Sequence, residues 1–183
     1  MILSEEETLI LVNQHDQQVG TERKLKVHRD GLLHRAFSIF IFNTKGELML
    51  QQRTLGKYHS GGLWTNTCCG HPRPKETTLA AAHRRLKEEM GFDCQLQEIR
   101  TITYQAQVSN NLIEHEFDHI YVGQFDDKPV LNPDEVSDWL CISTPDLQEW
   151  IAAQPQVFTV WFIKILSEAG TGCLDDWQAC TKK

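Results

Sequence analysis

The stretch from Trp64 to Gly91, WTNTCCGHPRPKETTLAAAHRRLKEEMG, decides the fold. It predicts a loop followed by a helix. Pro72 and Pro74 interrupt regular structure in the first half of the stretch. We expect the helix to begin at residues 76–78, where a threonine can cap it, and to stop at Gly91, a typical helix terminator.

One side of this helix should face a core. At about 100° per residue, four apolar side chains share a stripe: Leu79, Ala82, Leu86 and Met90. Glu89 lies at the edge of the stripe, and a carboxylate beside a core needs a partner such as a metal ion or an arginine. Arg85 is four residues earlier and can lie next to it.

Two motifs in the stretch carry a family resemblance. The spacing Gly70-x5-Glu76-x7-Arg84-Arg85-Leu86-x-Glu88-Glu89-x-Gly91-Phe92 resembles a Nudix box, G-x5-E-x7-R-E-U-x-E-E-x-G-U, in which U is apolar. It departs from the box at Arg85, where Nudix hydrolases carry a glutamate that commonly binds metal. The preceding WTNTCCGHP is similar to the W-T-N-x-x-C-G-H-P signature of type I isopentenyl-diphosphate delta-isomerases. The resemblance extends from about Lys24 to Trp161.

The resemblance implies an α+β fold, a Nudix-like α/β/α sandwich with a mixed sheet. It implies one domain over residues 1–183, with the Nudix-type box at 70–92. The length of 183 residues agrees with one domain and a substantial core. From apolar runs, alternation and turn residues we expect strands at 8–13, 36–42, 48–52, 113–122 and 136–142, one or two strands at 95–108, and helices at 144–153 and 158–169.

Composition limits the partners. A net charge of −7 argues against a nucleic-acid surface or an anionic membrane as the main partner. No apolar stretch approaches the ~20 residues that cross a bilayer, and the acidic N-terminus is unlike a secretory signal. Six cysteines without such a signal indicate reduced thiols in a cytoplasm. We expect a monomer or a weak homodimer that acts on a small molecule.

The segment around residues 113–117 predicts a cation site. In a strand, Glu114 and Glu116 lie on one face, and two like charges there need a cation or a proton between them. The resemblance implies a divalent ion, Mn²⁺, Mg²⁺ or Zn²⁺, bound by His28, His34, His71, Glu114 and Glu116. In the family the first two histidines are one residue further apart. The resemblance also implies that Glu89 holds a Mg²⁺ ion that bridges to a diphosphate. The histidines at 15, 59, 83 and 119 are expected only to be hydrogen-bonded.

The implied reaction interconverts isopentenyl and dimethylallyl diphosphate through a tertiary carbocation. Cys69 and Glu116 would be the two proton-transfer groups, with Cys69 as thiolate and Glu116 as acid beside Tyr104. Cys68 would be structural. In the family, a tryptophan at position 161 lines the hydrocarbon pocket. The diphosphate would be held by Lys24, Arg53, Lys57 and Arg85.

Two other functions fit parts of the sequence. A Nudix hydrolase of a nucleoside diphosphate derivative needs a glutamate cluster on the helix, which Arg85 interrupts. A non-catalytic module that binds a metal or ligand does not need Cys69, Glu116 and the histidines together.

Overall fold

A strand that is apolar on both faces forms the centre of the molecule. The computed structural model describes residues 7–181, and β3 (His34–Phe42) is buried along almost its whole length. Along one edge β3 pairs in parallel with β8 (Ile113–Gln124). Along the other edge it pairs antiparallel with three strands, β1 (Thr8–Val12), β6 (Cys68–Gly70) and β4 (Leu48–Arg53). The expected mixed sheet is confirmed.

Four more strands complete a nine-stranded sheet in the described part of the chain. They are β2 (Gln18–Arg23) beside β1, β7 (Leu96–Gln107) beside β8, and β5 (Trp64–Thr65) and β9 (Val136–Ile142) beside β4. β7 is one continuous strand with an irregularity between Glu98 and Arg100.

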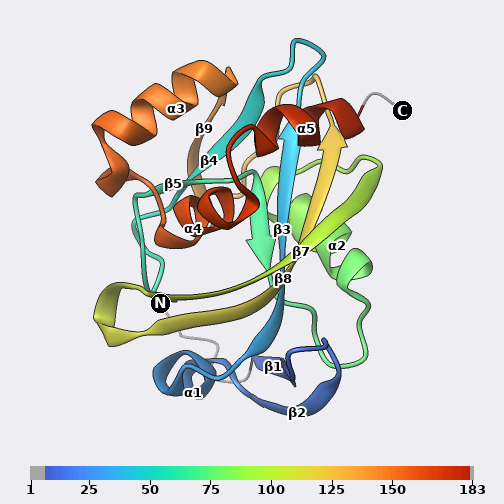
Figure 1. Cartoon of the computed structure of the whole chain (residues 1–183), viewed down its shortest axis with the longest axis vertical. Helices are drawn as coiled ribbons and strands as arrows, with labels where there is room; N and C mark the ends of the chain where they lie inside the picture. Colours follow the sequence, from blue (N-terminus) through green and yellow to red (C-terminus); the bar gives the residue numbers. More distant parts are fainter. Residues whose placement is uncertain (1–6, 182–183) are drawn as a thin grey trace.

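Helices cover both faces of this sheet, as Figure 1 shows, and the expected sandwich is confirmed. α2 (Thr78–Met90) packs on one face, where Leu86 and Met90 meet Phe37 and Ile39. The opposite face is covered by α3 (Thr144–Ala153), α4 (Val160–Ala169) and α5 (Cys173–Cys180). Two short 3₁₀ turns, Ser109–Asn111 and Pro155–Val157, connect elements.

α2 begins and ends as the sequence predicts. The Thr77 hydroxyl accepts a hydrogen bond from the Ala80 amide, and Gly91 ends the helix at φ 72°. Leu79, expected in the buried stripe, is 42% exposed, so that prediction is wrong. Burial starts only at Ala81, because the first turn precedes the contact between the helix and the sheet.

Several elements differ from the expectation, among them the strands β2 and β5. Residues 24–30 form the short helix α1 (Lys24–Asp30), which ends at Gly31 in the left-handed region. Cys68–Gly70 form strand β6 against β3 instead of a loop. Residues 173–180 form α5, where Trp177 packs edge-on against Phe40, with ring centroids 4.8 Å apart. Among the described residues, none of the helices combines the length and the apolar character needed to cross a bilayer.

Candidate active site

A cavity of about 690 Å³ opens between α1, β6, α2, the start of β8 and α4. It is lined by ten of the residues that the sequence predicts for the site: Lys24, Arg53, Lys57, Cys69, His71, Arg85, Glu89, Glu114, Glu116 and Trp161. The other three, His28, His34 and Tyr104, are buried. The structure therefore gathers side chains from distant parts of the chain around one space.

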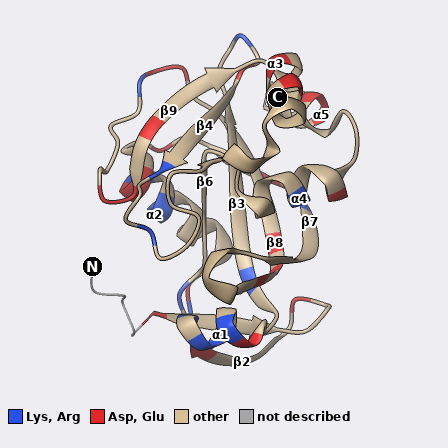
Figure 2. Cartoon of the chain, turned by 90° about the vertical axis from the view of Figure 1, so that its left-hand side faces the viewer, with Lys and Arg blue, Asp and Glu red and all other residues tan. Residues whose placement is uncertain are grey.

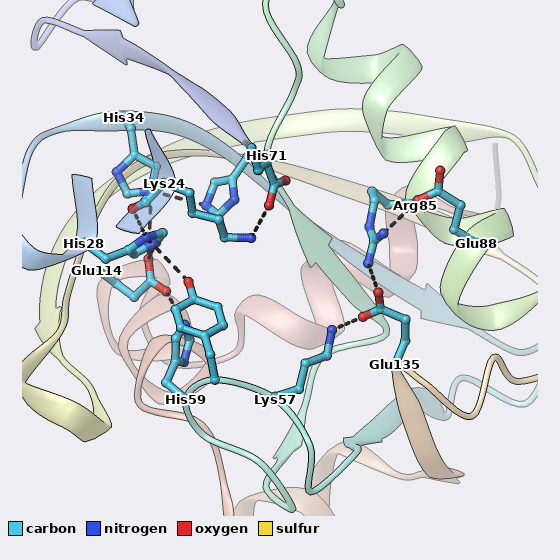
Figure 3. A network of polar contacts seen from close by, with 12 residues as sticks. Lys24, His28, His34, Lys57, His59, His71, Arg85, Glu88, Glu114 and Glu135 are labelled. Carbon is cyan, nitrogen blue, oxygen red and sulfur yellow. Dashed lines mark hydrogen bonds and ion pairs between the residues drawn. The ribbon is translucent and has the colours of Figure 1, made fainter. Parts of the chain in front are cut away.

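Three histidines and a carboxylate converge at one end of this cavity. The ligand atoms of His28, His34, His71 and Glu114 all lie within 4.8 Å of one another. His28 comes from α1, His34 begins β3, His71 follows β6 and Glu114 belongs to β8. Figure 3 shows the four side chains directed toward a common centre. The two histidines His28 and His34 are one residue closer in sequence than in the family, but they still meet, because α1 brings His28 back toward β3.

The histidines are oriented for metal binding. Nδ1 of His28 donates to the Lys24 carbonyl at 2.8 Å, and Nδ1 of His34 donates to the Leu32 carbonyl at 2.9 Å. Both Nε2 atoms are therefore left free to bind a metal. Nε2 of His28 and Oε2 of Glu114 lie 3.0 Å apart, yet each is buried without a hydrogen-bond partner. A divalent cation between these atoms fits the donor set.

Glu116 connects this cluster to the expected proton-transfer groups. Its Oε1 lies 3.0 Å from Nε2 of His71, and its Oε2 accepts a hydrogen bond from the Tyr104 hydroxyl. Cys69 is on β6, at the other edge of β3. Because β6 and β8 flank β3, the thiol and the carboxylate enter the cavity from two sides.

Burial controls the charges of these two groups. It raises the pKa of the Cys69 thiol to about 12. Burial and the neighbouring Glu114 also raise the pKa of Glu116, but the imidazoles of His34 and His71 beside its Oε1 outweigh them and hold it below its ordinary value. In the free protein the proton therefore lies on sulfur and Glu116 is a carboxylate. The sequence led us to expect the reverse distribution.

The four bases expected to form a diphosphate clamp lie beside the cluster: Lys24, Arg53, Lys57 and Arg85. Figure 2 shows basic residues on α1 and α2, although the chain as a whole is acidic. Arg53 is the base with an unused donor for an anion, because its Nε–H is buried without a hydrogen-bond partner. Burial lowers the pKa of Lys57 to about 8, which a nearby anion would oppose.

Carboxylates neutralise the other bases. Lys24 pairs with Glu7 at 2.7 Å. Glu135, in the turn before β9, pairs with Lys57 through one oxygen and with Arg85 through the other, the latter at 3.3 Å (Figure 3). The bases thus gather as predicted, but they share acidic partners that the sequence did not indicate.

Glu89 has the partners that its place on α2 requires. It is 6% exposed, pairs with Arg85 and accepts a hydrogen bond from Gln51 Nε2 at 2.8 Å. Although burial alone raises its pKa, Arg85 and Lys57 lower it below the ordinary value, so it is an anion at the cavity wall. Each carboxylate oxygen has a second lone pair, which leaves room for a hard cation such as Mg²⁺.

Trp161 forms the aromatic wall at the α4 side. It is 4% exposed, and the Arg53 guanidinium lies 5.0 Å from its ring centroid. The Arg53 guanidinium thus makes a cation–π contact with this indole, the kind of interaction by which an aromatic ring stabilises a carbocation.

Three further residues in or next to the site were not predicted from the sequence. His59, expected to be merely hydrogen-bonded, lies 3.2 Å from Glu114. Asp118, with its pKa raised by burial, accepts a hydrogen bond from the Ser38 hydroxyl at 2.8 Å. Its period-two spacing from Glu116 was a usable signal. No signal in the sequence identifies Glu135.

Comparison with known proteins identifies the family of this chain. A model of the NUDIX domain matches residues 32–162. The isopentenyl-diphosphate Delta-isomerase of Serratia proteamaculans is 54% identical over 94% of this chain and 96% of its own length. The protein of the same name from Burkholderia multivorans is 53% identical, over 94% and 98%.

Solved structures show the same fold at greater distance. DR0079 from Deinococcus radiodurans superposes with a TM-score of 0.67 at 22% identity, over 80% of this chain and 90% of its own. A MutT protein from Methanosarcina mazei gives 0.59 at 16% identity, over 82% and 96%. With the domain match and the near-full-length relatives, these findings place the chain in the isopentenyl-diphosphate Delta-isomerase family of NUDIX-domain proteins.

Proposed function

We propose that this isomerase interconverts isopentenyl and dimethylallyl diphosphate at the cavity between α1, β6 and α4. The supporting observation is that Cys69 and Glu116 enter one space from strands on either side of β3. Moving a double bond by one carbon requires a proton donor and a proton acceptor placed together. The same cavity has bases for a diphosphate and an aromatic wall for a carbocation.

The charges of the free protein suggest the order of proton transfers. The Cys69 thiol gives its proton to the terminal methylene carbon of isopentenyl diphosphate, and the π electrons form the new C–H bond. Glu116, hydrogen-bonded to Tyr104, then takes a proton from the carbon next to the diphosphate-bearing carbon, whose C–H electrons form the new double bond. One proton is gained and one lost, and the two groups exchange roles in the reverse direction.

We also propose that the cavity binds two divalent metal ions. His28, His34, His71, Glu114 and Glu116 would hold one divalent ion, Mn²⁺, Zn²⁺ or Mg²⁺, and Glu89 would hold Mg²⁺ at the diphosphate. When bound, these ions would neutralise carboxylate and diphosphate charge. The protein's own part is to orient the imidazoles through the Lys24 and Leu32 carbonyls.

We also propose a cellular compartment and an oligomeric state for the enzyme. All six cysteines, at positions 68, 69, 94, 141, 173 and 180, are free thiols, which supports a reducing cytoplasm. We propose that it acts on a small isoprenoid diphosphate as a monomer or weak homodimer. Size-exclusion chromatography with light scattering measures that oligomeric state.

Solvent deuterium tests the reaction. A proton carried by Cys69 or Glu116 exchanges with water, so in heavy water the dimethylallyl product should carry deuterium in its newly formed methyl group. The diphosphate should stay attached. Mass spectrometry of the product together with a phosphate assay measures both. Phosphate release without carbon-bound deuterium would favour the Nudix hydrolase. If neither phosphate release nor carbon-bound deuterium is observed, the protein is a non-catalytic binding module.

Substitutions of Trp161 test whether the reaction passes through a carbocation. If the indole stabilises a cation, the electron density of the ring matters as well as its size. Trp161→Phe should therefore retain more turnover than Trp161→Leu. Steady-state rates of the two variants at saturating substrate give the comparison. Equal rates would reduce Trp161 to a packing residue beside Phe158 and Phe162.

A further inference from the structure

His59 lies in the site without belonging to the predicted ligand set. It follows β4 in the loop that carries Lys57, and it is 5% exposed. Its Nε2 atom lies 3.2 Å from Oε1 of Glu114. The other oxygen of Glu114, Oε2, lies 3.0 Å from Nε2 of His28. Glu114 thus turns one oxygen toward the ligand cluster and the other toward His59 (Figure 3).

The surroundings of His59 fix its ring. The Ser60 hydroxyl lies 3.2 Å from Nδ1, where it can donate, so Nε2 carries the hydrogen and donates to Glu114. The ring packs edge-on with Trp161, at 88° with centroids 5.5 Å apart, and with Tyr58, at 73° with centroids 4.3 Å apart. With a donor on one side and two aromatic contacts, the imidazole is restricted to this orientation.

The backbone of His59 also supports the site. Its carbonyl accepts a hydrogen bond from Arg53 at 3.2 Å, and the Arg53 guanidinium lies over Trp161. One residue thereby contacts the metal-site carboxylate, the aromatic wall and the base best placed for an anion.

We infer that His59 is a positioning residue that holds Glu114 with a single oxygen directed at the metal. This inference rests on the proposed metal centre. A buried carboxylate with no fixed partner can rotate or bind through both oxygens, whereas a hydrogen bond to one oxygen selects the ligand geometry. Partners of this kind are typically worth about 10- to 100-fold in metal affinity. The contact with Trp161 also fixes the distance between the metal centre and the wall.

A pair of variants of similar size separates the hydrogen bond from packing. His59→Leu keeps bulk against Trp161 without a donor, and His59→Gln keeps a donor. The affinity of metal-free protein for Mn²⁺ is measured by electron paramagnetic resonance titration, before any substrate is added. We expect about a 10- to 100-fold weaker affinity for His59→Leu and less than about a threefold change for His59→Gln. His119→Ala, which loses contacts to Asp16, Glu98 and the Phe117 ring but none to the ligand cluster, is the control and should bind normally.

Turnover gives a second readout. At saturating Mn²⁺ the His59→Leu variant should recover most of its kcat, because excess metal compensates for a weakened site but not for a damaged fold. Wild-type affinity in His59→Leu would overturn the inference. If that variant does not fold, the nitrogen-15 spectrum of the wild-type protein decides, since a hydrogen on Nδ1 of His59 instead of Nε2 contradicts the proposed bond. Failure of the wild-type protein to bind any divalent ion would instead reject the metal centre itself.

Discussion

Replacing Cys69 by alanine should lower turnover of isopentenyl diphosphate by about 10²- to 10⁴-fold, the usual contribution of a positioned acid or base. Glu116→Gln should cost a similar factor, because the amide keeps the shape of the side chain but cannot take a proton. Both variants should still bind substrate, since neither residue belongs to the basic clamp. Steady-state kcat and a substrate dissociation constant measure the two effects separately.

The neighbouring cysteine provides a matched control. Cys68 lies on the same strand but is buried on the α2 side, among Leu86, Met90 and Ile39. Cys68→Ala should therefore change kcat little. An inactive Cys68→Ala beside an active Cys69→Ala would reverse the assignment of the proton-transfer group.

Removal of divalent metal should abolish activity. The unpartnered atoms of His28 and Glu114 face each other inside the protein, and without a cation the carboxylates at 114 and 116 lose the charge that balances them. Dialysis against EDTA should leave no measurable turnover, and adding Mn²⁺, Zn²⁺ or Mg²⁺ singly should show which ion restores it.

A ligand variant sharpens this test. His71→Ala removes one imidazole from the cluster and should shift the metal concentration for half-maximal activity upward. His83→Ala, in which a surface histidine loses its pairing with Asp93, should not shift it. Full activity in the chelated protein would reject the metal requirement.

The sequence predicted the parts of the fold whose patterns are local. The apolar run at 36–42 and the period-two segment from 113 predicted the two paired central strands, and Gly91 predicted the end of α2. α1 was missed because only Val27 and His28 of its seven residues are buried, so it has no apolar stripe.

The predicted site depended more on motifs than on periodicity. The signature around Cys69 and the box ending at Phe92 brought in His71, Arg85 and Glu89, and all of them line the cavity. His59 was not predicted, because a single histidine in a loop has no spacing that relates it to Glu114, a glutamate 55 residues later. Such pairs are set by tertiary structure alone.

The salt bridges of Glu135 have a consequence for which anions the enzyme accepts. Lys57 and Arg85 already pair with this carboxylate in the free protein. A diphosphate that binds these two bases therefore has to displace Glu135 from them. Glu135 is tethered to the same chain, which gives it an effective concentration that free monoanions in the solvent do not reach. Chloride or acetate therefore gains little by entering, whereas a ligand that contacts several bases at once can compete. If these bases hold the diphosphate as we propose, Glu135 acts as a tethered competitor that makes the proposed clamp selective for multivalent anions.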